Sequence, residues 1–233
     1  IIQMVHCIVK LKMTIFLSHQ TQGKLIFLCY YLILSFFCGC VKEQCQKLKP
    51  NKYDIVIADP PWWNKYIRRL KGANDKLSYS MMYNEDVASI PLKDLLSKNC
   101  LIAVWCTNAL SNINAVKNII FPEWGVEYVT TWYWLKLNIE LAPLCAFSAG
   151  CQKQPYERVM IGKIGDVKNI PRDLLLASVP SALHSHKPPL LGKKADEHMG
   201  HLMVCGHQTP LDIGTVRNVS HRLHRQCATN LGT

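Results

Sequence analysis

Acidic residues are scarce in this sequence. It contains 16 Asp+Glu against 27 Lys+Arg, which gives a formal net charge of +11 at pH 7, and the first 41 residues contain no acid at all. A basic balance of this kind favours a polyanionic partner. Nine of the basic residues lie in residues 42–77. On charge alone, a solvated basic face remains the alternative interpretation.

Charged residues are few, and the cysteine spacing of a zinc site is absent. Each of these two observations excludes a class of protein. Only 18% of the residues are charged and 49% are apolar, which excludes a disordered chain. The eleven cysteines lack the spacing of a zinc site, because the group Cys38, Cys40 and Cys45 has neither a His pair nor a second CxxC. Five of the nine histidines follow Leu191 without a partner set at metal spacing. We therefore expect no metal site, and reduced cysteines in a reducing compartment.

Residues 1–41 differ from the rest of the chain. The run "LIFLCYYLILSFFCGCV" at 25–41 is at the lower limit for a membrane span. Three interpretations are open: a membrane anchor, a buried hairpin, or sequence that is not native to the protein. We favour the third, because nothing downstream resembles a membrane protein, and we expect no stable membrane association.

Buried-strand patterns are orderly from Tyr53 onward. Unbroken apolar or β-branched runs predict strands, and "ALSNINAVKNII" at 109–120 predicts a helix. The alternation predicts an α/β fold with a doubly wound, mainly parallel sheet. We expect three regions: an apolar segment at 1–41, a catalytic domain at 42–190, and a divergent tail at 191–233. The predicted strands are 53–59, 100–108, 126–136, 156–164 and 174–181, and "HLMVCG" at 201–206 could be another.

The stretch "YDIVIADPPWWNK" at 53–65 places an acid, two prolines and a tryptophan at the end of a buried strand. Ligands of open α/β sheets bind at the carboxyl ends of strands. The two prolines make the chain rigid where it leaves the strand, and their carbonyls would be free acceptors. Asp59 and the carbonyl of Pro60 could accept hydrogen bonds from the two N–H groups of an adenine N6 amine, and Trp62 could stack on the adenine ring. The structural alternative is a turn in which Asp59 is a cap and the tryptophans pack in the core.

This motif resembles the catalytic motif of the adenine-N6 methyltransferases related to the mRNA adenosine methyltransferase subunit. Further stretches resemble the methyltransferase-like protein 4 branch of that family, from about residue 52 to 190. They are "CLIAVWCTN" at 100–108, "PEWGVEYVTTWYWLK" at 122–136, "KQPYERVMIGK" at 153–163 and "SVPSALHSHKPPL" at 178–190. The resemblance implies a Rossmann-like fold that binds S-adenosyl-L-methionine and methylates N6 of adenine in nucleic acid.

The resemblance also implies roles for individual residues. Asp59, Pro60, Pro61 and Trp62 match the catalytic motif, and Asp59 also faces the cofactor. Lys187 matches a lysine that approaches the methionine carboxylate of the cofactor, with His186 beside it; Glu157 matches a position near the target base. Without the resemblance, Lys187 and Glu157 would be interpreted as surface residues. The residues expected to contact substrate are Trp62, Asn64, Lys65, Arg68, Arg69 and Glu157.

The implied substrate is an adenosine in RNA, with small nuclear RNA first and DNA adenine second. The implied location is the nucleus, with the cytosol as an alternative, and no protein partner is indicated. A base in a loop, at an end or in a single strand reaches Asp59 most easily, because it need not leave a stack.

The chain departs from this family after "HKPPL". Relatives continue into segments of the types "LELFAR" and "GWTSWGNE", which supply contacts to the cofactor ribose, whereas this chain continues with "LLGKKADEHMGHLMVCG". We expect the tail to replace the ribose-binding segment, which places the activity of this chain in doubt. The alternatives are a catalytically silent nucleic-acid-binding relative and, from residues 25–41 alone, a membrane-anchored protein.

Overall fold

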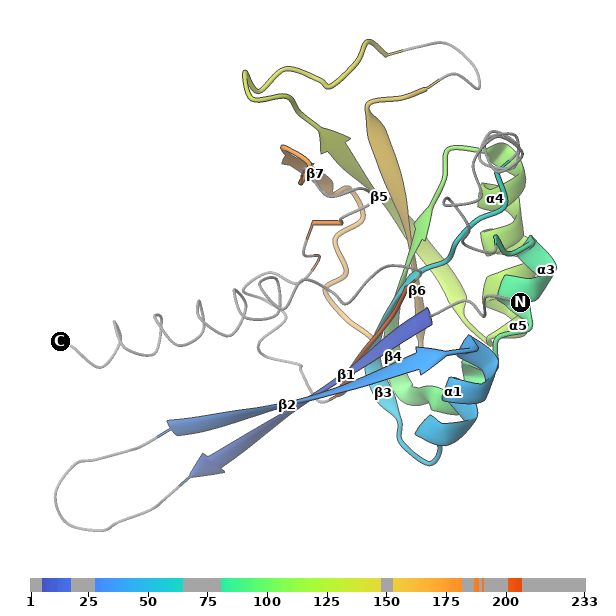
Figure 1. The fold of residues 1–233 in the computed structure, drawn as a ribbon, viewed down its shortest axis with the longest axis vertical. Helices are drawn as coiled ribbons and strands as arrows, with labels where there is room; N and C mark the ends of the chain where they lie inside the picture. The colour runs from blue at the N-terminus through green and yellow to red at the C-terminus, as the bar shows by residue number, and fades with distance from the viewer. Residues whose placement is uncertain are drawn as a thin grey trace, which may run out of the picture.

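The computed structural model of the protein describes residues 6–17, 28–64, 81–147, 153–181, 187, 188, 190 and 201–206, with side chains from residue 39 onward and without those of 201–206. Figure 1 shows the arrangement of its elements. In chain order they are β1 His6–Leu17, β2 Leu28–Gly39, α1 Val41–Leu48, β3 Tyr53–Asp59, α3 Asn84–Ala88, η2 Lys93–Leu95, β4 Leu96–Cys106, α4 Leu110–Ala115, the π-helical turn η3 Val116–Ile120, α5 Phe121–Glu123, β5 Glu127–Lys136, β6 Tyr156–Ile164, β7 Leu175–Ser178 and β8 His201–Gly206.

All eight of these strands belong to one sheet, in the order β2-β1-β8-β3-β4-β6-β5-β7. β3 pairs in parallel with both β4 and β8, and β5 pairs in parallel with β7. β6 is antiparallel to both of its neighbours, and β1 is antiparallel to both of its own. It follows that six of the eight run in one direction, and that β1 and β6 run in the other. The predicted α/β class is confirmed, and the sheet is mixed, with three parallel and four antiparallel pairs of neighbouring strands.

The predicted strands between residues 53 and 178 agree with the observed ones, with small differences at the ends. β4 begins at Leu96, four residues before the predicted start. The predicted end of the helix before Phe121 is wrong, because helical structure continues to Glu123. Pro122 is the second residue of α5, which continues directly from the π-helical turn η3.

The two faces of the sheet bury separate cores. On one face, Val56, Val104 and Met160 belong to a core that also includes residues of α1, α3, α4, η3 and α5. On the other face, Ala103, Trp105, Trp132, Trp134, Val159 and Ile161 form a second cluster, against which Ile57, Leu176 and Leu190 pack. Alternate residues of a strand face opposite sides, so the strands divide their side chains between the cores by parity. Figure 1 shows the helices gathered on one side of the sheet.

The first 39 residues contain two strands that extend the sheet. β1 and β2 pair antiparallel in a twelve-residue register, and β1 also pairs with β8. The apolar run at 25–41 thus includes β2, which matches the hairpin interpretation in outline, although the origin of this segment stays a prediction. Within the described part of the chain, no helix has the length and apolar character needed to cross a membrane.

Part of the divergent tail lies beside the strand that leads to the Asp-Pro-Pro-Trp motif. Residues 201–206, which the sequence suggested as a strand, form β8 and pair with β3 from Ile55↔Leu202 to Asp59↔Gly206. β8 therefore fills the sheet position next to β3. The three predicted regions stay predictions.

Gly162 of β6 tests how closely the helical layer packs on the sheet. A Cβ at this position would lie 2.3 Å from Cγ1 of Val126 and 2.9 Å from a ring carbon of Phe121. We expect Gly162→Ala to lower the free energy of unfolding by roughly 1–3 kcal/mol, because the core must shift to admit the methyl group. Urea unfolding measures the change. Lys163→Ala, at the next position, should stay within about 0.5 kcal/mol of the wild type; equal losses in both variants would contradict the packing argument.

Candidate active site

The Asp-Pro-Pro-Trp motif forms a tight turn at the carboxyl end of β3. The Trp62 N–H donates to the Pro60 carbonyl at 2.8 Å, and the Met82 N–H donates to the Pro61 carbonyl at 2.8 Å. The Trp63 N–H in turn donates to the Met82 carbonyl. The prediction that both proline carbonyls are free acceptors is therefore wrong, because the backbone N–H groups of Trp62 and Met82 already donate to them. Each carbonyl oxygen has two lone pairs, so Pro60 retains one for a ligand.

The Trp62 side chain points into the helix-covered core. Only 7% of the residue is exposed, and its indole N–H donates to the Trp105 carbonyl at 2.8 Å. This bond fastens the turn to the end of β4. Trp62, which was expected to stack on a base, is thus buried in the core, as the structural alternative proposed. Its stacking role stays a prediction. Trp63 is more exposed and stacks on Tyr83, with ring centroids 6.0 Å apart.

Asp59 lies on the opposite face of the sheet, and strand direction brings Glu157 to it. β6 runs against β3, β4 and β5, so its first residues lie at the edge where those strands end. Glu157 pairs with Trp134 near the end of β5. Asp59, Trp105, Trp134 and Glu157 share the side of the sheet that carries the second apolar cluster, by the same parity that divides the two cores.

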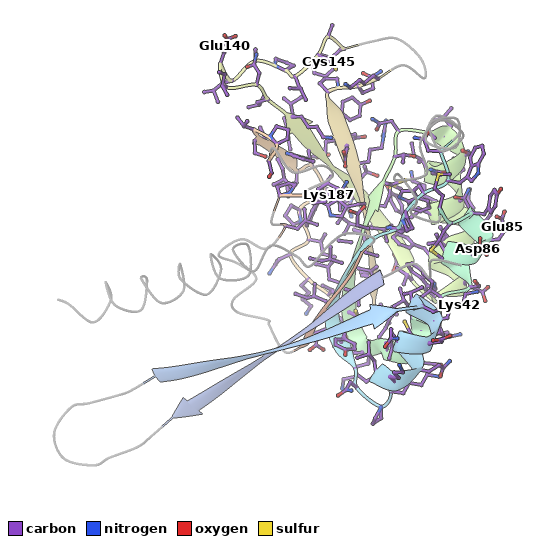
Figure 2. All side chains as sticks on the ribbon, viewed as in Figure 1. Lys42, Glu85, Asp86, Glu140, Cys145 and Lys187 are labelled. Carbon is purple, nitrogen blue, oxygen red and sulfur yellow. The ribbon has the colours of Figure 1, made fainter. Side chains whose placement is uncertain are left out.

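Lys187 joins the two carboxylates. Its Nζ lies 2.8 Å from Oε2 of Glu157 and 3.7 Å from Oδ2 of Asp59. The same ammonium lies 5.4 Å from the centre of the Trp105 ring, within cation–π distance. Figure 2 shows Lys187 beside the central strands, away from the helix that carries Glu85 and Asp86. The structure therefore brings together three of the residues that the sequence selected: Asp59, Glu157 and Lys187.

Lys136 belongs to the same cluster and was missed by the sequence analysis. It is the last residue of β5, and its Nζ donates to Oε1 of Glu157. It also lies 4.8 Å from the centre of the Trp134 ring. Each oxygen of the Glu157 carboxylate therefore has its own ammonium partner. The sequence signal for Lys136 was weak, because a lysine that ends a strand is ordinarily a solvated residue.

Burial and charge act in opposite directions on these groups. Burial raises the pKa of Asp59 from 3.8 to about 6; Lys187 works against this and Glu157 adds to it. Burial also opposes ionisation of Glu157, but Lys187 and Lys136 outweigh it and lower the pKa of Glu157. Burial likewise opposes the charged form of Lys187, yet Asp59 and Glu157 outweigh it and raise the pKa of Lys187. The result is an ionised Glu157–Lys187 pair beside a carboxyl group that titrates near neutral pH.

The other predicted contacts divide into two groups. Asn64 is exposed, and its backbone N–H lies 3.2 Å from Sδ of Met81. Lys65, Arg68, Arg69 and His186 lie outside the described residues, so their roles stay predictions. In the part of the chain whose side chains are described, no group of three or more His, Cys, Asp or Glu is arranged to hold a metal ion.

The arrangement suits a ligand that carries both charges. Asp59 can accept from an amine and Lys187 can donate to a carboxylate, and the two groups lie at one edge of an open sheet, where ligands of α/β proteins bind. Recognition of such a ligand by Asp59 and Lys187 uses hydrogen bonds and ion pairs alone.

Comparison with known proteins identifies relatives of this sequence. The sequence pattern of the MT-A70 family matches residues 53–213. The chain is 32% identical over 150 residues to the human N(6)-adenine-specific methyltransferase METTL4, covering 59% of this chain and 30% of the relative. It is 36% identical over 165 residues to a Caenorhabditis elegans DNA N6-methyl methyltransferase, covering 67% and 42%. It is 34% identical over 145 residues to the Cryphonectria parasitica N6-methyladenosine RNA methyltransferase MTA1, covering 60% and 42%. The chain thus spans less than half of the length of each.

The raised pKa of Asp59 predicts a pH-dependent effect of Asp59→Asn. Because the folded-state pKa of about 6 exceeds the unfolded value of 3.8, the folded state retains a proton that the unfolded state releases. This stabilisation is complete below pH 3.8 and is lost as the pH rises through 6. One pKa unit corresponds to about 1.4 kcal/mol. Between pH 4 and pH 7, the free energy of unfolding of Asp59→Asn should therefore rise by roughly 2–3 kcal/mol relative to that of the wild type.

Urea unfolding at several pH values measures this difference. Asp166→Asn, at an exposed carboxylate, is the matched control for the loss of a surface acid. Parallel pH profiles for the wild type and Asp59→Asn would contradict the assignment.

Proposed function

The chain belongs to the MT-A70 family, and from this premise we propose that it transfers a methyl group to N6 of adenine in nucleic acid. The observation that carries the proposal is the Asp59–Lys187–Glu157 cluster, in which Asp59 directly precedes a rigid Pro-Pro turn at the carboxyl edge of the sheet. The relatives named as N6-adenine methyltransferases of RNA and DNA support the reaction type.

We propose S-adenosyl-L-methionine as the cofactor, which supplies an electrophilic methyl group when it is bound. The chemistry of the donor set fits the amino-acid part of this molecule. Lys187 would bind its carboxylate and Asp59 its amine, with His186 as a further proposed contact. Glu157 is already paired with Lys136, so Lys187 can turn toward a new anion while Glu157 keeps a counter-ion.

The residues of the turn would orient the target base. The Asp59 oxygen that the cofactor amine leaves free and the remaining lone pair of the Pro60 carbonyl can accept hydrogen bonds from the two N–H groups of the N6 amine. These bonds fix the direction of the nitrogen lone pair. The Trp62 bond to β4 holds the turn rigid, so little reorganisation accompanies the reaction. Ionised Asp59 is the stronger acceptor of these hydrogen bonds, and its pKa of about 6 allows ionisation at neutral pH.

We propose RNA as the substrate, with small nuclear RNA first and DNA as the alternative, and the nucleus as the location, with the cytosol as its alternative. Relatives named for RNA and for DNA methylation have similar identities to this chain, so the proposal rests on the ease with which an unpaired base reaches Asp59.

A silent nucleic-acid-binding relative is the second candidate. The observation in its favour is that Lys187 is already engaged by both carboxylates. Calorimetric titration of the full chain with S-adenosyl-L-methionine distinguishes the two. One-to-one binding supports the enzyme, whereas a folded chain that does not bind supports the silent relative.

Asp59→Ala tests the catalytic role directly. We expect at least a ~100-fold loss of methyl transfer, because the acceptor that orients the amine is removed. Transfer of a labelled methyl group from S-adenosyl-L-methionine to single-stranded RNA and DNA oligonucleotides measures the loss. An oligonucleotide with purine in place of adenine is the substrate control, and Asp166→Asn is the protein control. Activity retained in a folded Asp59→Ala chain would overturn the proposed role of Asp59.

Charge reversal of Arg68 and Arg69 tests the predicted nucleic-acid face. If both contact phosphates, the double Glu variant should bind an RNA oligonucleotide more weakly and show a flatter dependence of log K on log salt concentration, by about 0.7 per lost contact with a single strand. Fluorescence anisotropy at several salt concentrations measures the slope. An unchanged slope would remove these arginines from the binding face.

A further inference from the structure

Arg158 lies beside the proposed active site, but on the other face of the sheet. It follows Glu157 in β6, so strand alternation turns its side chain toward the helix-covered face. It pairs in register with Cys106 at the end of β4 and with Tyr133 of β5. Arg158 therefore occupies the same edge as Asp59, two strands away, at a backbone separation of about 10 Å.

The guanidinium of Arg158 is held in place by neutral groups. Its Nε donates to Oδ1 of Asn108 at 3.0 Å, and Nη1 donates to the Tyr133 hydroxyl at 3.1 Å. The Asn108 amide is itself oriented by a bond to the Tyr156 carbonyl at 2.8 Å. The rings of Tyr133 and Tyr156 lie 5.2 and 5.6 Å from the guanidinium carbon.

Among the residues whose side chains are described, no carboxylate forms an ion pair with Arg158. The neighbouring acid, Glu157, points to the other face and is bound by Lys136 and Lys187. Arg158 is thus a fixed, half-buried cation without a counter-ion in this part of the chain. A guanidinium offers five donors, and its hydrogen bonds to the described residues use two of them.

We propose that Arg158 binds a phosphate of the nucleic acid that flanks the target base; this rests on the function proposed above. A guanidinium matches phosphate geometry with its fork of donors, and a fixed fork loses little entropy on binding. The backbone positions of Arg158 and Asp59 are about 10 Å apart at one edge of the sheet, and a strand of nucleic acid that crosses this edge could reach both side chains.

Phe147 adds a second reason for a nucleic-acid ligand. Its ring packs against Tyr156 at 6.4 Å and is 64% exposed. Tyr156 thus lies between the exposed Phe147 ring and the Arg158 guanidinium. Proteins that bind single-stranded nucleic acid combine aromatic rings, on which bases stack, with cations that contact the backbone. The opposing interpretation is that Arg158 only ties β4, β5 and β6 together.

The salt dependence of binding separates these two roles. The full chain, R158Q, R158K and the control K168Q are titrated with a fluorescent single-stranded RNA oligonucleotide across a range of salt concentrations. Lys168 lies in the connection between β6 and β7, so K168Q removes one positive charge without touching the Arg158 contacts. Circular dichroism checks that each variant is folded.

We expect R158Q to lower the salt slope by about 0.7, the value for one phosphate contact with a single strand, and K168Q to leave it unchanged. R158K should keep the slope but bind several-fold more weakly, because an ammonium cannot replace the fork. A wild-type slope in R158Q, an equal slope change in K168Q, or wild-type affinity in R158K overturns the inference. Any of these three results leaves the proposed function intact. A wild-type chain that binds no oligonucleotide overturns both the Arg158 contact and the proposed function.

Discussion

One ammonium group, that of Lys187, holds together two carboxylates that would otherwise repel each other. Asp59 comes from β3 and Glu157 from β6, and two carboxylates at one site cannot both ionise freely without a cation between them. Lys136 completes the balance by occupying the other oxygen of Glu157. The cluster thus contains two potential negative charges and two positive ones, with Asp59 as the member whose ionisation is least supported.

The reversed direction of β6 is what makes this cluster possible. If β6 ran parallel to its neighbours, Glu157 would begin the strand at the far edge of the sheet, away from Asp59. Because it is antiparallel, its first residues face the carboxyl ends of β3, β4 and β5. The same reversal also places Arg158 at this edge, and strand alternation turns it to the opposite face from Glu157. A single topological feature therefore supplies both the carboxylate of the cluster and the guanidinium beside it.

The sequence was a good guide to strands and to the motif, and a poor guide to side-chain partners. Runs such as "YDIVIAD" predicted strands because burial on both faces demands continuous apolar residues. Lys136 was missed because its contact with Glu157 depends on the pairing of β5 with β6, which no local pattern encodes. The burial of Trp62 was only the alternative interpretation, because the turn after two prolines decides which face the ring enters. Lys187 and Glu157 were found through family resemblance and not through local chemistry.

The charge balance also constrains which ligand the proposed site can take. A purely anionic ligand would compete with Asp59 and Glu157 for Lys187, and a purely cationic one would compete with Lys187 for both carboxylates. A ligand with an amine and a carboxylate on one carbon exchanges these interactions in pairs and leaves the net charge of the cluster unchanged. Because Lys136 remains on Glu157, separating Lys187 from it does not leave a buried carboxylate unpaired, which would be strongly destabilising. Lys136, which the sequence analysis missed, is thus the residue that would allow Lys187 to change partners.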